Sequence, residues 1–190
     1  MIGLLPGSRA NEIKRLLPVI LQSVEVLAQR FPHARFVLNQ ASSVADSALK
    51  PYLDACPIPI QTVQGRNYDV LQCCDAVITV SGTATLEVAL AGVPMAIIYK
   101  VAPVTYWLGR WLISIKFIGL PNILAGRSIV REFIQHEANA DTIAGEISRI
   151  IEDPPYAERI RQDLSQVKAL LGEGGGSAKL ARLAADMLAA

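Results

Sequence analysis

In the first half of the chain, short apolar runs rich in β-branched residues alternate with longer segments of helical periodicity. Each short run is apolar at successive positions, which is typical of parallel strands that are buried on both faces. Strands that alternate with helices favour an α/β fold with a Rossmann-like, doubly wound parallel sheet, in the strand order 3-2-1-4-5. The runs predict strands at residues 2–5, 34–38, 60–63, 76–80 and 95–99. The segments between them predict helices at residues 13–30, 44–55, 68–74 and 85–91.

Beyond Tyr99 this alternation stops, and the pattern predicts helices with no further strand. The expected helices cover residues 104–114, 128–136, 140–151, 156–171 and 178–188. A glycine-rich stretch at residues 172–176 would let the last helix fold back or exchange with a second subunit, which makes a homodimer an open expectation. We therefore predict a Rossmann-like domain over residues 1–152 and C-terminal helices over residues 153–190 that pack on, or swap with, a partner domain.

The turn after the first predicted strand contains Gly7, Ser8 and Arg9, which are residue types suited to an anionic ligand. Glycine permits close approach of the backbone, serine supplies a hydroxyl donor, and arginine supplies a fork-shaped cation that matches phosphate. A plain strand-to-helix turn, with Ser8 as the helix cap and Arg9 in solvent, would read the same way in the sequence. The tripeptide alone does not decide between the two interpretations.

The turn after the fourth predicted strand brings Ser81, Gly82, Thr83 and Thr85 together, so hydroxyls and backbone N–H groups are dense there. Glu87 follows about one helical turn later, where its carboxylate could accept two vicinal hydroxyls such as those of a ribose. Helix capping by Ser81 or Thr83 is the alternative interpretation of the same residues. The dense donors make this turn the better candidate for a phosphate cradle.

In the predicted strand order, strands one and four are neighbours and the chain reverses direction between them. Both turns then face one crevice, at the carboxyl ends of the strands, where ligands of open α/β sheets bind. Two donor-rich turns on one crevice suit the diphosphate of a nucleotide. The chain has neither a GxGxxG nor a GxxxxGK[ST] sequence, which disfavours NAD binding and ATP hydrolysis.

A segment near the middle of the chain combines aromatic and basic residues, namely Tyr106, Trp107, Arg110 and Trp111. The two tryptophans are four residues apart and would share one face of a helix, with the cation within reach of lipid head groups. A helix at the membrane interface is one interpretation. Packing against another domain or a second subunit is the other, because exposed apolar patches often mark protein interfaces.

Composition narrows the class of protein further. Lysine and arginine total 18 against 17 acidic residues, so no broad basic surface for nucleic acid is expected. The 3 cysteines show no metal-ligand spacing and are expected to be free thiols in a cytoplasmic protein. No apolar run reaches the length of about 18 residues that a membrane span needs. The chain opens inside a strand, and we therefore expect it to be the C-terminal part of a longer protein.

Three motifs occur in order: residues 5–9 (LPGSR) with Glu12, residues 81–87 (SGTATLE) and residues 120–127 (LPNILAGR). Together they closely resemble the lipid-A-disaccharide synthase family of GT-B glycosyltransferases, which are built from two Rossmann-like halves. The match runs from the first residues to about Gln135, with looser agreement through the terminal helices. The resemblance implies that this chain is the C-terminal, UDP-sugar-binding half and that an N-terminal acceptor half is its missing partner.

By the same resemblance, the complete enzyme would transfer diacylglucosamine from UDP-2,3-diacylglucosamine to lipid X and release UDP. It would work without a cofactor or a metal ion, because helix N-termini and Arg9 would stabilise the leaving group. The catalytic base would lie in the missing half, so the isolated chain is expected to be inactive. The implied UDP-binding residues are Gly7, Ser8, Arg9, Ser81, Gly82, Thr83, Thr85 and Glu87. Asn122, Arg127, Glu132 and Gln135 are implied near the donor sugar or behind it.

Two other functions stay open from the sequence. The chain could be a fragment that binds UDP or a UDP-sugar without turnover. It could instead belong to another UDP-GlcNAc-type enzyme, since epimerases and peptidoglycan glycosyltransferases use similar folds, although the motif at residues 120–127 argues against them. For the favoured function, a lipid substrate implies a cytoplasmic protein that contacts the inner face of the cytoplasmic membrane peripherally.

Overall fold

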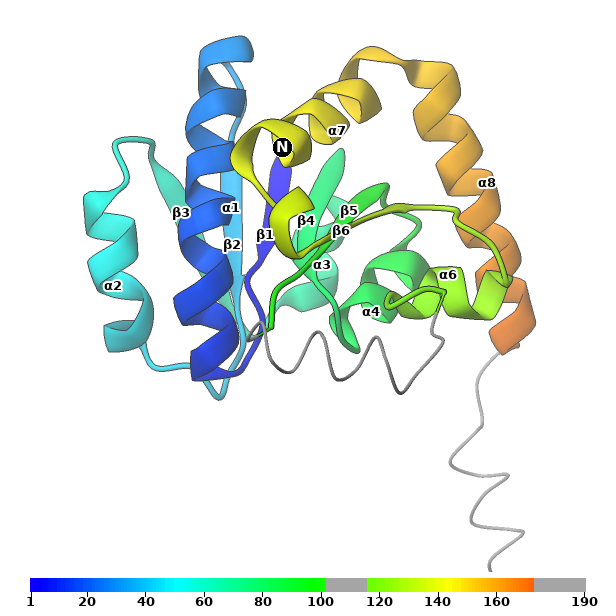
Figure 1. The fold of residues 1–190 in the computed structure, drawn as a ribbon, viewed down its shortest axis with the longest axis horizontal. Coiled ribbons are helices and arrows are strands. Elements are labelled where there is room, and N and C mark those ends of the chain that lie inside the picture. Colours follow the sequence, from blue (N-terminus) through cyan, green and yellow to red (C-terminus); the bar gives the residue numbers. More distant parts are fainter. Residues whose placement is uncertain (102–115, 173–190) are drawn as a thin grey trace, which may run out of the picture.

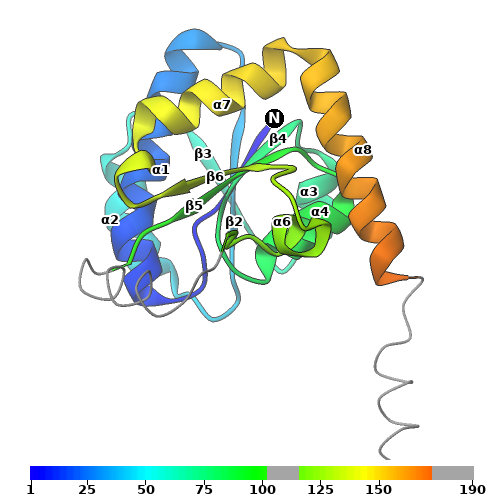
Figure 2. The ribbon, with the colours of Figure 1, turned by 45° about the vertical axis from the view of Figure 1, so that its right-hand side comes forward.

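A computed structural model describes residues 1–101 and 116–172 of the chain. They form one six-stranded parallel sheet with helices on both faces (Figures 1 and 2). The strands are β1 (Ile2–Leu5), β2 (Phe36–Gln40), β3 (Ile60–Gln64), β4 (Ala76–Val80), β5 (Met95–Tyr99) and β6 (Arg131–Ile134). The helices are α1 (Ala10–Arg30), α2 (Asp46–Ala55), α3 (Asn67–Gln72), α4 (Ala84–Ala91), α6 (Leu120–Ala125), α7 (Ala140–Glu152) and α8 (Pro154–Leu171), with a short 3-10 helix η1 (Gln135–Glu137).

The strand order is β3-β2-β1-β4-β5-β6, so the predicted doubly wound parallel sheet is confirmed and extended by one strand. β1 lies between β2 and β4, with Ile2 opposite Ala76 and Leu5 opposite Thr79 in the second pair. The chain therefore reverses its direction of winding between β1 and β4. The carboxyl ends of these two neighbouring strands meet at one edge of the sheet, as the predicted site requires.

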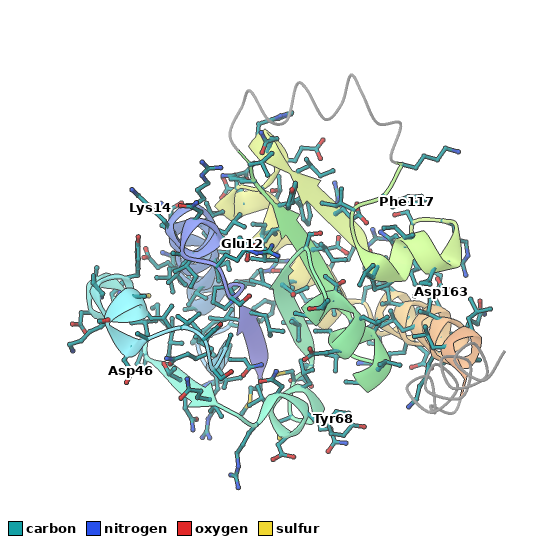
Figure 3. The ribbon with its side chains drawn as sticks, turned by 90° about the horizontal axis from the view of Figure 1, so that it is seen from below. Glu12, Lys14, Asp46, Tyr68, Phe117 and Asp163 are labelled. Atoms are coloured by element: carbon teal, nitrogen blue, oxygen red, sulfur yellow. The ribbon has the colours of Figure 1, made fainter. Side chains whose placement is uncertain are left out.

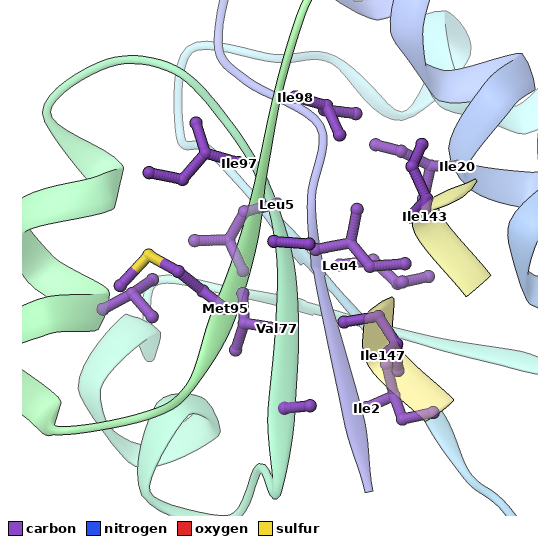
Figure 4. Packing of buried hydrophobic residues seen from close by; sticks show 14 of the residues in the cluster. Ile2, Leu4, Leu5, Ile20, Val77, Met95, Ile97, Ile98, Ile143 and Ile147 are labelled. Carbon is purple, nitrogen blue, oxygen red and sulfur yellow. The ribbon is translucent and has the colours of Figure 1, made fainter. Parts of the chain in front are cut away.

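Successive residues of the central strands point to opposite faces of the sheet, and both faces are covered by apolar side chains. Leu4 points toward Ile20 of α1 and Ile147 of α7, whereas Leu5 points to the other face, near Met95 (Figure 4). The predicted periodicity of α1 is confirmed, because its inward positions are all buried. These positions are Ile13, Leu16, Leu17, Ile20, Leu21, Val24 and Leu27. Each such side chain stabilises the fold by about 1.5–3 kcal/mol when fully buried.

The prediction of a helix at residues 128–136 is wrong, since β6 and η1 occupy this stretch and the helix α6 precedes them. β6 is an edge strand with Arg131 exposed and Phe133 buried, a short alternation that a helical period also fits. The expectation that all strands are buried on both faces fails at β3, the other edge. There Gln61, Thr62 and Gln64 are exposed, at the edge of the described sheet.

Helix α8 packs back on the same domain, against α4, α6 and α7. Its inward positions Ala157, Ile160, Leu164 and Val167 belong to the main hydrophobic core. Residues 153–172 thus contribute to the domain of residues 1–152. The predicted helices at residues 104–114 and 178–188 lie outside the described residues, and exchange of the chain's end with a partner stays a prediction.

Candidate nucleotide-binding site

The turn between β1 and α1 is shaped around Gly7. Its φ of 93° lies in the left-handed region, which glycine adopts without the steric cost that a Cβ brings. A Cβ at this position would lie 2.6 Å from Oε2 of Glu12, so the carboxylate packs directly against the backbone of the turn. Ser8 and Arg9 follow with exposed side chains at the start of a 21-residue helix. Glu12 thus packs against the turn from one side, while the side chains of Ser8 and Arg9 are exposed to solvent.

Arg9 is held beside the N-terminus of α1 by Glu12. Its Nη1 donates to Oε1 of Glu12 at 2.8 Å, and its backbone N–H donates to Oε2 at 3.4 Å. Arg9 itself is the N-cap residue, so the alternative of a cap at Ser8 does not hold. The Arg9 side chain is 82% exposed, and an exposed ion pair contributes little, so its guanidinium is free to bind an incoming anion.

The turn between β4 and α4 is closed by its own hydroxyls. The Thr85 hydroxyl donates to the Gly82 carbonyl oxygen at 2.7 Å, and the Thr85 side chain is fully buried. The Thr83 side chain does not cap α4, which removes that alternative. Gly82 and Thr83 are exposed, so they are the residues of this turn that can face a ligand. In the structure, Thr85 shapes the turn rather than presenting its hydroxyl at the surface.

Ser81 connects the second turn to the third motif. Its backbone N–H donates to the Ile98 carbonyl at 3.0 Å, and its hydroxyl donates to the Ile118 carbonyl at 2.9 Å. The hydroxyl therefore does not cap α4 and instead joins two segments that lie 37 residues apart in the sequence. Its oxygen keeps lone pairs for a further donor.

Glu87 lies in the first turn of α4 with an exposed side chain. Its Oε2 accepts a hydrogen bond from Nδ2 of Asn67, the first residue of α3, at 3.3 Å. The second carboxylate oxygen can accept hydroxyls, as the ribose role requires. Sequence reasoning missed Asn67; its position at a helix start after Gly65 was the one available signal.

Next to the turn that follows β4, Glu132 binds the backbone that leads into α6. Its carboxylate accepts the N–H groups of Ile118 and Gly119, both at 2.9 Å, and Nδ2 of Asn122 at 2.7 Å. A Cβ at Gly119 would lie 2.3 Å from Cδ1 of Ile97 and 3.1 Å from Oε1 of Glu132, so any larger residue would require the Ile97 side chain to move. Glu132 thus positions the segment whose carbonyl binds Ser81.

Asn122 completes this support and is fully buried. Its Nδ2 also donates to the Val130 carbonyl at 2.8 Å, and its Oδ1 accepts the N–H groups of Ile129 and Val130 at 2.8 and 3.0 Å. All its hydrogen-bonding capacity is used within the protein. Asn122 and Glu132 were predicted either to contact the donor sugar or to support residues that do. Their hydrogen bonds within the protein fit the supporting role.

Arg127 is directed away from the two turns, toward α8. Its guanidinium binds Asp163 in a two-point pair at 3.0 and 2.6 Å, and this hydrogen bonding lowers the pKa of the Asp163 carboxyl. Figure 3 looks onto the carboxyl edge of the sheet and shows Asp163 well separated from Glu12. In this arrangement Arg127 fastens α8 rather than facing the crevice.

Gln135 lies just after β6 and binds the chain just after β5. Its Oε1 accepts the Val101 N–H at 2.9 Å, and its Nε2 donates to the Val101 carbonyl at 3.3 Å. The predicted interface residues Tyr106, Trp107, Arg110 and Trp111 follow in the sequence and lie outside the described residues. In the described part of the chain, none of the helices has the length and apolar character that a membrane crossing needs.

Comparison with solved structures defines the fold class first. A UDP-GlcNAc 2-epimerase from Neisseria meningitidis, bound to UDP-GlcNAc, aligns with a TM-score of 0.57 over 91% of this chain and 45% of its own, at 15% identity. A glycosyltransferase from Streptomyces nogalater aligns with a TM-score of 0.54 over 96% of this chain and 42% of its own, at 24% identity. The chain thus has the Rossmann-like fold found in one half of such proteins.

Sequence comparison is more specific. A family profile described as "Lipid-A-disaccharide synthetase" matches residues 1–185. The lipid-A-disaccharide synthase of Geobacter sulfurreducens is 51% identical over 188 residues, which cover 99% of this chain and 49% of the relative. The chain belongs to the lipid-A-disaccharide synthetase family. It spans about half the length of the curated relatives it matches.

Proposed function

We propose that this chain is the donor-binding half of a glycosyltransferase of lipid A biosynthesis. We propose that UDP binds between the turn that follows β1 and the turn that follows β4. The observation that carries the proposal is the pairing of β1 with β4, which places residues 7–9 and 81–83 at one edge of the sheet. Backbone N–H groups at the N-termini of α1 and α4 and the exposed Arg9 suit a diphosphate.

The donor we propose is UDP-2,3-diacylglucosamine and the acceptor is lipid X, in keeping with the family name. The bond between the anomeric carbon and the diphosphate oxygen breaks, and its electron pair stays on UDP. An acceptor hydroxyl forms the new glycosidic bond and gives its proton to a base. Arg9 and the helix N-termini stabilise the charge that develops on UDP, while Glu87 accepts the ribose hydroxyls.

We propose that the base and most of the acceptor site belong to the half of the relatives that this chain does not cover. We propose no cofactor and no metal ion, because cations and helix N-termini can stabilise the leaving diphosphate. The Neisseria meningitidis epimerase gives a parallel for the nucleotide, since it shares the fold and was solved with UDP-GlcNAc. The family assignment favours transfer over epimerisation for this chain.

Turnover is tested by fusing this chain to the part of the Geobacter sulfurreducens synthase that it does not match. The fusion is expected to form disaccharide from UDP-2,3-diacylglucosamine and lipid X, whereas the 190-residue chain alone is expected to form none. Arg9→Ala in the fusion should lower the rate strongly, with Arg35→Ala, an exposed arginine beside β2, as control. Robust product from the chain alone would overturn the two-half proposal, and an active fusion indifferent to Arg9→Ala would overturn the site.

We further propose that the segment containing Tyr106, Trp107, Arg110 and Trp111 brings the protein to the inner face of the cytoplasmic membrane, where a lipid substrate is available. The chain has 2 tryptophans, Trp107 and Trp111, so its tryptophan fluorescence reports on this segment alone. Vesicles with anionic lipid are expected to shift the emission to the blue, and neutral vesicles to shift it less. Unchanged emission with both kinds of vesicle would contradict membrane contact.

A further inference from the structure

Three basic side chains line an open hollow at the carboxyl edge of the sheet, beyond β5 and β6. Arg15 comes from α1, Lys100 from the end of β5 and His136 from η1, and the hollow has a volume of about 350 Å³. This volume lies at the lower end of the range of about 300–1,000 Å³ for ligand pockets. Its other lining residues, Val101 and Gln135, carry no charge, so in the described part of the chain no acidic side chain lines it.

The backbone beside the hollow is held in a strained conformation. Gln135 has a φ of 55°, and among the described residues it alone has a positive φ without being glycine. This conformation is unfavourable for a residue with a Cβ and persists where the surroundings determine it. Here the two hydrogen bonds between its amide and Val101 do so. These hydrogen bonds hold the residues that follow β5 next to the residues that follow β6. They thereby fix the positions of the Lys100 and His136 backbones relative to each other.

Lys100 is only half-exposed, and burial lowers the pKa of its ammonium group from the ordinary value. A cation that has lost part of its hydration gains more from an opposite charge than one in bulk water. Among the described residues, Lys100 has no carboxylate partner, and neither has Arg15. The hollow therefore suits binding of an external anion, because no carboxylate of the described residues neutralises its cations.

We propose that Arg15, Lys100 and His136 bind a phosphate monoester, the phosphate of the sugar acceptor. This inference depends on the proposed function, in which the residues of the two turns already bind the diphosphate of the donor. The hollow lies at the same edge of the sheet, and Arg15 is on the helix whose N-terminus carries Arg9. A donor and a phosphorylated acceptor would thus be held by separate cations next to one crevice, as a transfer between two anionic substrates requires.

The test uses the 190-residue chain saturated with UDP and glucosamine 1-phosphate as the soluble probe. Nuclear magnetic resonance titration should shift the backbone amides of Val101 and His136, and glucosamine without phosphate should not. Lys100→Met keeps the apolar stem and removes the charge. It should raise the Kd of the probe about tenfold, which corresponds to about 1.4 kcal/mol. Lys100→Arg should retain binding. Lys14→Met, an exposed cation next to Arg15 that does not line the hollow, is the matched control and should change nothing.

The outcomes separate this inference from the proposed function. If UDP binds but the probe does not, or if Lys100→Met and Lys14→Met behave alike, the phosphate site is wrong and the UDP site stands. If UDP itself does not bind, the proposed function fails first. Inorganic phosphate as a third ligand identifies the source: equal affinity assigns the hollow to phosphate alone, and tighter binding of glucosamine 1-phosphate assigns it to the sugar phosphate. Capture of vesicles rich in phosphatidylglycerol without binding of either soluble probe would overturn the proposal in favour of a lipid surface.

Discussion

The carboxylate of Glu132 and the amide of Asn122 together make six hydrogen bonds that no local pattern specifies, because their partners lie 7 to 14 residues away. They hold the peptide whose carbonyl accepts the Ser81 hydroxyl. Ser81, a residue of the proposed UDP site, is thus coupled through one peptide to Glu132, which holds that peptide in place. At the residue scale, the shape of the second turn depends on side chains that a ligand would not touch.

Asn122→Ala removes four of these hydrogen bonds and leaves buried backbone groups of Ile129 and Val130 without partners. The free energy of unfolding is expected to fall by about 2–4 kcal/mol, since each unsatisfied buried group costs about 1–3 kcal/mol. Urea denaturation measures the loss. Asn11→Ala, at an exposed position of α1, is the control and should stay within about 0.5 kcal/mol of the native chain. A loss below about 1 kcal/mol for Asn122→Ala would contradict the support role.

Gly7→Ala places a Cβ where φ is 93° and where Oε2 of Glu12 lies 2.6 Å away. We expect a loss of about 1–2 kcal/mol in stability from the left-handed conformation alone, together with weaker UDP binding because Glu12 must move. Gly145→Ala is the matched control, at an exposed mid-helix position with nothing within 4 Å of the added Cβ. It should stabilise the chain by about 0.5–1 kcal/mol. Equal effects of the two substitutions would show that Gly7 has no conformational role.

The sequence predicted the residues of both turns because glycine, hydroxyl and arginine side chains next to strand ends are a local signal. It did not separate Thr83, which is exposed, from Thr85, which is fully buried. It also grouped Arg127 with the site, although its guanidinium binds Asp163 on α8. These differences depend on which way a side chain points after packing, and periodicity does not contain that information for so short a turn.

At the scale of elements, long periodic segments were predictable and short edge segments were not. α1 repeats its apolar positions over 21 residues, so chance agreement with another period is excluded. β6 has 4 residues, one of them fully buried, and its strand conformation comes from pairing with β5. The same pairing brings Glu132 beside the α6 segment, so the error about this strand concealed the role of Glu132 as well.

The attachment of α8 to α6 gives a prediction about pH. Arg127 holds the pKa of Asp163 below its ordinary value of 3.8, so the unfolded chain takes up this proton before the folded one. The pair stabilises the fold fully above about pH 5, and its contribution is lost as the pH falls through 3.8 toward the lower folded value. Asp163→Asn should therefore differ most from the native chain at neutral pH, and the difference in stability should shrink as the pH falls below 3.8.

Denaturation at several pH values measures this convergence. Glu158→Gln serves as the control, because Glu158 pairs with Arg161 at 3.6 Å on the exposed side of the same helix. Such a surface pair contributes little, and its removal should give a small difference at every pH. A constant difference between Asp163→Asn and the native chain from pH 7 to pH 3 would contradict a depressed Asp163 pKa.

At the scale of the whole molecule, the described residues form an open parallel sheet covered by helices, and the proposed site lies at the carboxyl edge of this sheet. Both turns and the basic hollow lie at the carboxyl ends of the strands. The chain matches 49% of the Geobacter sulfurreducens relative, and under the proposed function this edge would form one wall of a cleft completed by the remaining half. Under the proposed function, this chain binds the donor, and the other half supplies the base that takes the proton of the acceptor hydroxyl.

The central claim is that residues 7–9 and 81–83 form a UDP site, and calorimetric titration of the 190-residue chain with UDP tests it most directly. We predict that UDP binds one site per chain and that inorganic phosphate binds far more weakly. Arg9→Ala should weaken UDP about tenfold or more, since it removes a charge-assisted contact, whereas Arg127→Ala should leave the affinity unchanged. Failure of UDP to bind, or equal affinity of the native chain and Arg9→Ala, would contradict the account.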